Sequence, residues 1–120
     1  MERRLFKREP ISMNGELTWT TKSRLGRTAK NHAFVRTSNL SLDGAQVEMT
    51  GTLPFSLGAT VRLTLGIQPC DVQIKDVSHQ RGRTILRVSF LSPSTSFVQV
   101  LEEYLPVDAK ARAHYQQKWI

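Results

Sequence analysis

Repeated alternation between apolar and polar residues constrains the fold of this chain more than any other feature. It is clearest at residues 61–67, where Val61, Leu63, Leu65 and Ile67 alternate with polar residues or glycine. A period of two is typical of a β-strand with one buried face, because successive side chains of a strand point to opposite sides. Six segments show this period: residues 11–19, 34–40, 45–49, 61–67, 72–77 and 86–90.

Two of the six segments are irregular. In the fifth, the alternation slips at Asp76 and Val77, which predicts a β-bulge or a strand end there. The segment 34–40 is the weakest, because Ser38 and Asn39 are poor strand formers.

Turn-forming residues separate the predicted strands at Asp43-Gly44, Pro54, Gly58 and Arg81-Gly82. This spacing is typical of antiparallel structure. We therefore expect an all-β fold with six antiparallel strands, closed into a barrel because closure leaves no exposed strand edge. A two-sheet sandwich is the alternative that the pattern leaves open.

The period becomes helical after the last strand. Ser92 and Pro93 are typical of an N-cap followed by the first helical residue, and Pro106 would stop the helix. One face would carry Phe97, Val98, Leu101, Tyr104 and Leu105. We expect this C-terminal helix to pack on the sheet, and a second helix with a thin apolar face to span residues 108–118.

The chain length of 120 residues fits one domain. We expect an N-terminal arm over residues 1–10 and a barrel with a C-terminal helical segment over residues 11–120. Cys70 is the only cysteine, so no internal disulfide forms and a reducing cytoplasm is the expected location. No membrane insertion is expected, because no apolar run approaches about 18 residues and the N-terminus lacks a signal-peptide core.

Positive charge gathers in the N-terminal third of the chain. The formal net charge is +7 and the pI is near 10.2, which favours an anionic partner. The cations of this region are Arg3, Arg4, Lys7, Arg8, Lys22, Arg24, Arg27, Lys30 and Arg36, and no acid lies between Thr21 and Arg36.

The arm contains two arginines at a spacing of four, Arg4 and Arg8. Pro10 biases Glu9 away from helical geometry, so we expect the arm to be extended and flexible. On an extended segment the two arginines stand roughly 13 Å apart, a span suited to a dinucleotide. The planar fork of arginine makes bidentate bonds to phosphate or guanine, which the point charge of Lys7 cannot do.

A second motif follows in the sequence Ser38-Asn39-Leu40-Ser41-Leu42-Asp43-Gly44. Asn39 and Ser41 share one parity, so we expect both side chains on the outer face while the leucines between them enter the core. Gly44 permits a backbone conformation or a close approach that other residues resist. Each motif alone has a simpler interpretation: a solvated basic arm, and a hairpin turn at Asp43-Gly44.

Taken together, R-x-x-x-R and [D/N]-x-S-x-x-G, in that order on an all-β frame, resemble the PilZ domain family. The resemblance covers nearly the whole chain, since that family has a six-stranded antiparallel barrel followed by a helix. The stretch Leu86-Arg87-Val88-Ser89-Phe90 also looks like the closing strand of the family.

The resemblance implies a bacterial receptor for the second messenger cyclic di-GMP. Arg4 and Arg8 would grip guanine edges and phosphates, and Asn39 and Ser41 would hydrogen-bond the ligand, while Gly44 keeps the turn close. Arg3 lies where family members differ in binding one ligand or a stacked pair. Ligand binding would then change a contact between this chain and an unidentified downstream protein. No catalytic residue, metal or cofactor is expected in this chain.

One departure from the family is the long interval between Arg8 and Asn39, which we attribute to a basic loop over residues 21–32. If the loop folds over the site it would aid phosphate binding, and if it projects outward it would meet a partner or nucleic acid. Two rival functions stay open: a basic barrel that binds RNA or single-stranded DNA, and a PilZ-like adaptor that binds no ligand. The first ranks lower, because few aromatic residues accompany the cations.

No motif typical of an enzyme stands out. His32, His79 and His114 lack the spacing of metal ligands, and Ser41 lacks the context of a catalytic nucleophile. Cys70 is expected to be a small core residue, since no cation flanks it.

Overall fold

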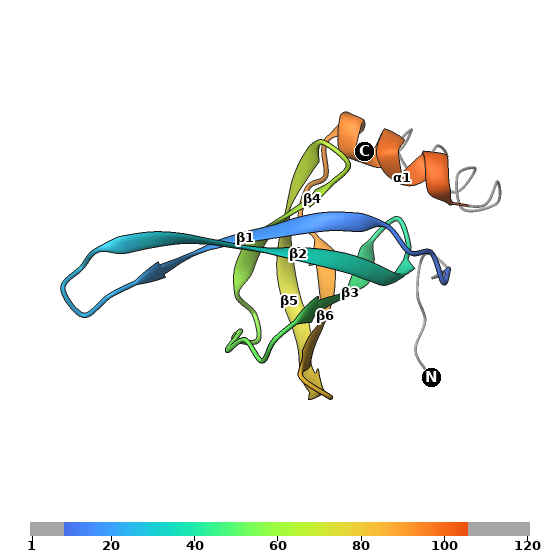
Figure 1. The fold of residues 1–120 in the computed structure, drawn as a ribbon. Helices are drawn as coiled ribbons and strands as arrows, with labels where there is room; N and C mark the ends of the chain where they lie inside the picture. Colours follow the sequence, from blue (N-terminus) through green and yellow to red (C-terminus); the bar gives the residue numbers. More distant parts are fainter. Residues whose placement is uncertain (1–8, 106–120) are drawn as a thin grey trace.

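The computed structural model describes residues 9–105, which form a closed barrel of six antiparallel strands and one helix (Figure 1). The strands run around the barrel in the order β1-β2-β3-β6-β5-β4, and β4 pairs with β1 to close it. The elements are β1 (Asn14–Lys22), β2 (Thr28–Leu40), β3 (Gly44–Thr50), β4 (Thr60–Leu65), β5 (Gln68–Gln80), β6 (Arg83–Phe90) and α1 (Thr95–Tyr104). The predicted barrel is confirmed, and the sandwich is excluded.

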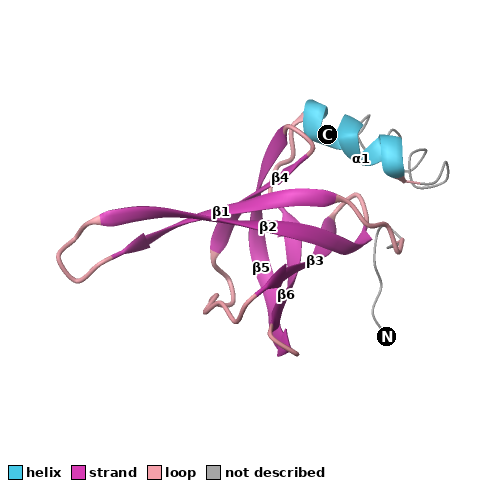
Figure 2. Ribbon diagram, in the orientation of Figure 1, coloured by secondary structure: helices cyan, strands magenta, loops and turns pink. Residues whose placement is uncertain are grey.

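Alternation of side chains along each strand fills the barrel with aliphatic groups. On β4, Val61, Leu63 and Leu65 point inward and are at most 6% exposed, as the sequence pattern predicted. The helix α1 lies across one end of the barrel (Figure 2). Its Phe97 is fully buried and meets Phe90 of β6 edge to face, with ring centroids 5.0 Å apart. The expected packing of the helix on the sheet is thereby confirmed.

The helix begins two residues later than the sequence indicated. Ser94, and not Ser92, is the N-cap: its hydroxyl accepts a hydrogen bond of 3.1 Å from the backbone N–H of Phe97. Ser92 instead has a φ of 45° in the turn after β6, so Pro93 belongs to the connection and not to the first helical turn. The helix ends at Tyr104, directly before Leu105.

Strand β4 is shorter than predicted, because Ile67 does not continue it. The chain reverses at Gly66, which has a φ of 62°, and Ile67 is 87% exposed in that turn. The predicted irregularity in β5 is confirmed as a register shift between Ile74 and Asp76, after which the strand continues to Gln80. A second shift lies in β2 between Thr37 and Asn39 and was not predicted.

The predicted basic loop over residues 21–32 is wrong: these residues belong to a β-hairpin. β1 and β2 stay paired from Asn14 with Arg36 to Lys22 with Thr28, and a short turn joins them. Of β1, only Gly15–Thr18 also pairs with β4, and β3 joins β2 only from Arg36 onward. Residues 19–31, which we call the ribbon, therefore project from the barrel as two strands that pair with no third strand of the described chain (Figure 1). Two strands that hydrogen-bond only to each other are marginally stable alone and depend on the barrel at their root.

Residues 1–8 and 106–120 lie outside the described residues. The expected positions of Arg3, Arg4 and Arg8 in the arm, and the second helix at 108–118, therefore stay predictions. In the part of the chain that the structure describes, no helix is long and apolar enough to cross a membrane.

Candidate functional site

The described chain begins against the end of β2. Glu9 and Leu40 form an antiparallel bridge in which each backbone N–H donates to the other residue's carbonyl at 2.8 Å. Leu40 lies between Asn39 and Ser41, the two polar residues of the second motif. The bridge therefore joins the root of the N-terminal arm to this motif, although the two residues are far apart along the chain.

A buried threonine holds the segment that follows Glu9. The hydroxyl of Thr37 accepts a hydrogen bond of 2.8 Å from the N–H of Met13 and donates one of 2.6 Å to the carbonyl of Ile11. The N–H of Thr37 also donates to the carbonyl of Met13 at 2.9 Å. The path of residues 11–13 is thus fixed to β2, close to Asn39. No sequence motif marks Thr37, and alternation alone would place it outside, because it shares the parity of Asn39 and faces the core only through the register shift at Ser38.

Ser41 does not lie on the outer face, and that expectation is wrong. It is fully buried, and its hydroxyl lies within hydrogen-bond distance of both Asp43 and Gly44. The oxygen accepts from the N–H of Gly44 at 3.2 Å and of Asp43 at 3.3 Å, and the hydroxyl also lies close to the Asp43 carboxylate. Ser41 follows the last residue of β2, so strand parity no longer applies to it, and its side chain closes the turn instead.

Gly44 is required for a close approach, as the sequence suggested. A Cβ atom at this position would lie 2.3 Å from the carbonyl oxygen of Val88 on β6. Gly44 pairs with Ser89 in the ladder between β3 and β6, so a larger residue would push these strands apart just below the turn.

Asn39 borders a hollow on the outer face of the barrel with a volume of about 560 Å³. The strand register places one row of polar side chains across it: Asn39 of β2 opposite Gln46 of β3, Gln46 opposite Arg87 of β6, and Arg87 opposite Asp76 of β5. The remaining lining residues are Glu48, Ser78, Gln80 and Ile85. The volume of the hollow is in the range of small-molecule binding sites. Arg87 and Gln46 are candidate ligand contacts that no sequence motif marks.

Ser38 and Gln46 hold the rim of this hollow. The side-chain amide of Gln46 donates to the hydroxyl of Ser38 at 3.0 Å. Ser38 occupies the register shift of β2, and this shift changes the parity of the strand. Val35 and Thr37 are buried before it, whereas Leu40 is buried after it and Asn39 is half-buried at the surface. The outward position expected for Asn39 therefore depends on the bulge.

The lining of the hollow is not cationic by itself. Glu48 and Asp76 contribute two carboxylates and Arg87 one guanidinium. An anionic ligand here would need additional positive charge from another part of the chain.

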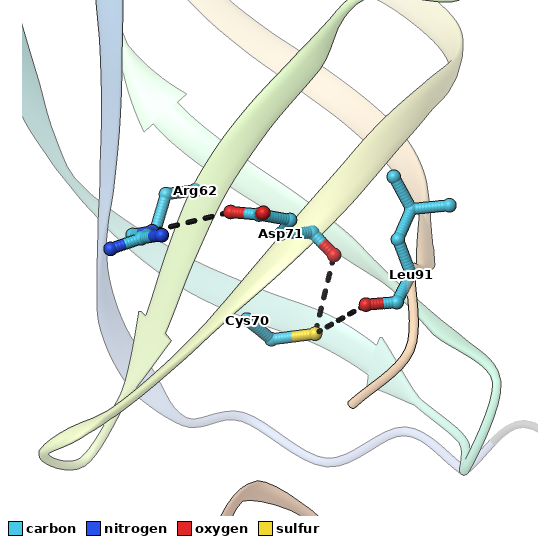
Figure 3. A network of polar contacts seen from close by, with 4 residues as sticks. All are labelled: Arg62, Cys70, Asp71 and Leu91. Carbon is cyan, nitrogen blue, oxygen red and sulfur yellow. Dashed lines mark hydrogen bonds and ion pairs between the residues drawn. The ribbon is translucent and has the colours of Figure 1, made fainter. Parts of the chain in front are cut away.

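Cys70 belongs to the core, as expected. It is 6% exposed, and burial together with the charge of the neighbouring Asp71 raises the pKa of its thiol. Figure 3 shows its sulfur beside the backbone carbonyls of Asp71 and Leu91, while the Asp71 carboxylate faces away to Arg62 at 3.2 Å. A thiol whose pKa is raised is poorly nucleophilic.

The two histidines of the described residues make unrelated contacts. The ring of His79 contacts the carbonyl of Leu53 at 3.0 Å, and His32 packs edge to face with Phe34. Over residues 9–105, no group of three or more His, Cys, Asp and Glu side chains could hold a metal ion.

No protein-family model matches the sequence, and no curated protein matches it significantly. Solved structures do match its fold. The inhibitor of motility MotI/DgrA from Bacillus subtilis is 12% identical with a TM-score of 0.63; the match covers 98% of this chain and 53% of that one, so this chain spans about half its length. The PilZ domain of YcgR from Escherichia coli, solved with c-di-GMP, is 17% identical with a TM-score of 0.57, and the match covers 99% of this chain and 100% of that domain. Longer YcgR, in complex with c-di-GMP, matches over 49% of its length with a TM-score of 0.54. The barrel and its terminal helix are therefore a PilZ-like fold.

Proposed function

We propose that this chain is a receptor for cyclic di-GMP without catalytic activity, which binds the dinucleotide between its N-terminal arm and the outer face of the barrel. One observation carries the proposal: the bridge between Glu9 and Leu40, which brings the root of the arm beside Asn39 and the hollow. The two motifs that the sequence separates would then act on one ligand.

The arm would supply the charge that the hollow lacks. Arg8 directly precedes Glu9, so covalent geometry keeps their Cα atoms about 3.8 Å apart, and Arg4 lies within about 14 Å of Arg8. Cyclic di-GMP carries two phosphate charges and two guanine bases. Arginine can bind the phosphates or the O6 and N7 edge of guanine with two parallel bonds, and it can stack on a base. Arg3 would add a cation for a second, stacked ligand.

The barrel would supply complementary polar groups. Asn39 lies on the rim nearest the arm, and Arg87 lies in the same row of side chains. The carboxylates of Glu48 and Asp76 suit the amino group of a guanine, which is a hydrogen-bond donor. Ser41 and Gly44 would serve the site by fixing the turn after Asn39.

The neighbouring structures support this choice of ligand and output. The YcgR domain of the same fold was solved with c-di-GMP, and MotI/DgrA is described as an inhibitor of motility. A ligand held by the arm and the barrel together would fix the arm over the hollow, which creates a new surface for a downstream protein.

Calorimetric titration with cyclic di-GMP, and with GTP and cyclic di-AMP for comparison, tests the proposal. We expect binding of cyclic di-GMP alone, and its stoichiometry reports on Arg3. Arg4→Ala or Arg8→Ala should largely abolish binding and leave the unfolding curve unchanged. Lys7→Ala is the matched control, because it removes one charge from the same segment without removing a guanidinium fork. Equal losses in all three variants would show that only net charge matters and would contradict the proposed clamp.

A further inference from the structure

The ribbon concentrates the positive charge of the described residues. Residues 9–105 contain ten lysines and arginines and eight aspartates and glutamates. Four of these cations and none of the acids lie on the ribbon: Lys22, Arg24, Arg27 and Lys30. The rest of the described chain therefore has a net charge of −2, and the ribbon has a net charge of +4.

The end of the ribbon is a defined turn. The carbonyl of Ser23 accepts a hydrogen bond of 3.0 Å from the N–H of Gly26, and the N–H of Ser23 donates to the carbonyl of Arg27 at 2.8 Å. Arg24 and Leu25 occupy the central positions of this turn, and Leu25 is 85% exposed. The turn therefore holds Arg24 and Arg27 at the outermost part of the molecule.

The two lysines of the ribbon lie on one face, one on each strand. Lys22 pairs with Thr28, and Lys30 pairs with Thr20. Thr20 and Lys22 share one parity on β1, so the side chains of both pairs point to the same side. The four cations thus surround the tip of the ribbon.

We propose that the ribbon inserts into a groove of duplex DNA and binds backbone phosphates without sequence preference. Its two strands lie about 4.8 Å apart, and its paired residues extend roughly 13 Å beyond the barrel before the turn. The major groove, about 12 Å wide and about 8.5 Å deep, admits a two-stranded β-ribbon. Lysine and arginine bind the phosphates on either side, and the hydroxyls of Thr20, Thr21 and Thr28 are further phosphate donors.

Edge protection, membrane insertion and single-strand binding fit the ribbon less well. Lysines on exposed strands prevent edge-to-edge pairing, which would account for Lys22 and Lys30, but Arg24 and Arg27 lie in the turn, outside both strands, where there is no strand edge to protect. Insertion into an anionic membrane needs several apolar side chains at the tip, where Leu25 stands alone among polar residues. A single-stranded ligand needs successive aromatic platforms. The ribbon offers Trp19 at its root, and that ring packs against Phe55 at a centroid distance of 4.8 Å.

This surface is separate from the proposed cyclic di-GMP site. The ribbon contains the first residues of β2, whereas Asn39 and Leu40 end that strand. A strand of 13 residues places these ends roughly 40 Å apart. The proposal for DNA therefore stands or fails independently of the proposal for cyclic di-GMP.

The test is fluorescence anisotropy of the full chain with a labelled duplex of mixed sequence, about two helical turns long. We expect the logarithm of the affinity to fall with the logarithm of salt concentration, with a slope of about −3 to −4 for four phosphate contacts. Arg24→Gln/Arg27→Gln should reduce the magnitude of this slope by about 2. The matched control is Lys75→Gln/Arg83→Gln, which removes two exposed cations from the β5–β6 hairpin and should leave the slope unchanged.

Unfolding curves of both variants should match that of the parent, because all four positions are exposed. Equal losses in the two double variants would overturn the proposal, since they would show a response to net charge alone. Tighter binding of the corresponding single strand, or of vesicles containing phosphatidylserine, would overturn it in favour of those ligands. Absence of duplex binding at about 50 mM salt would also overturn the proposal, because phosphate contacts are strong under that condition.

Discussion

Glu9 and Leu40 exchange two backbone hydrogen bonds of 2.8 Å, and this pair is the connection between the two motifs of the chain. The chain between them first builds β1, then the ribbon, and returns along β2. The long interval between Arg8 and Asn39 thus consists mainly of the β1–β2 hairpin, whose far end projects from the barrel as the ribbon. An insertion of this kind does not disturb the proposed site, because its ends remain paired at the barrel.

Thr37→Val should lower both stability and ligand affinity. The substitution keeps the shape of the side chain but removes the hydroxyl that bonds Met13 and Ile11. An unsatisfied buried N–H costs about 1–3 kcal/mol of unfolding free energy, and the segment that positions the arm would lose its anchor. Urea unfolding and calorimetry with cyclic di-GMP measure the two effects.

Thr84→Val is the control for this prediction. The hydroxyl of Thr84 is equally buried and bridges Leu53 and Gly51 at 2.9 and 2.7 Å, away from the arm. It should cost similar stability and leave affinity unchanged. Parallel losses of affinity in both variants would mean that general destabilisation, and not the position of residues 11–13, sets the affinity.

Asn39→Ala and Ser41→Ala should separate binding from folding. Asn39 is half-buried at the rim of the hollow, so its loss should weaken cyclic di-GMP binding by about 1–3 kcal/mol and change stability little. Ser41 is fully buried and holds the turn, so its loss should lower the unfolding free energy by about 1–2 kcal/mol. Calorimetry and urea unfolding of each variant measure the two quantities. If Asn39→Ala bound like the parent, Asn39 would have no role in the site.

The sequence predicted those features that depend on local alternation. Strand β4 and the bulge of β5 follow from apolar periodicity, since burial of one face is a local property of a strand. Alternation predicts Ser41 on the outer face, but β2 ends at Leu40. The position of the Ser41 side chain is therefore set by its hydrogen bonds in the turn and not by strand parity. Ile67 was misplaced for a related reason, since an apolar residue in a turn continues the pattern without continuing the strand.

Contacts between distant strands could not be predicted in the same way. The row from Asn39 to Arg87 exists because of strand order and register, which are properties of the closed barrel. The sequence predicts a loop over residues 21–32, because the threonines and cations there show no apolar alternation. The strands of the ribbon need no such alternation, because they lie outside the barrel and neither of their faces covers its core.

Gly44→Ala should destabilise the barrel. The added Cβ would lie 2.3 Å from the Val88 carbonyl, closer than van der Waals contact allows, and the obstacle is backbone that cannot rotate away. We expect a loss of about 1–3 kcal/mol in urea unfolding. The sign of this change in unfolding free energy is decisive. In a strand without such a contact, replacing glycine by alanine would stabilise the protein by about 0.5–1 kcal/mol. An increase in stability would contradict the close packing of β3 on β6.

Cys70 should make the stability of the fold decrease at alkaline pH. Burial raises the pKa of its thiol in the folded chain, whereas the unfolded thiol ionises near its ordinary value of about 8.5. Unfolding therefore releases a proton above that pH, so the unfolding free energy should fall as the pH rises from about 8 to 10. Urea unfolding of the parent and of Cys70→Ala across this range isolates the effect from other groups that titrate there. The parent should lose stability more steeply, and identical slopes would show that the thiol ionises equally in both states.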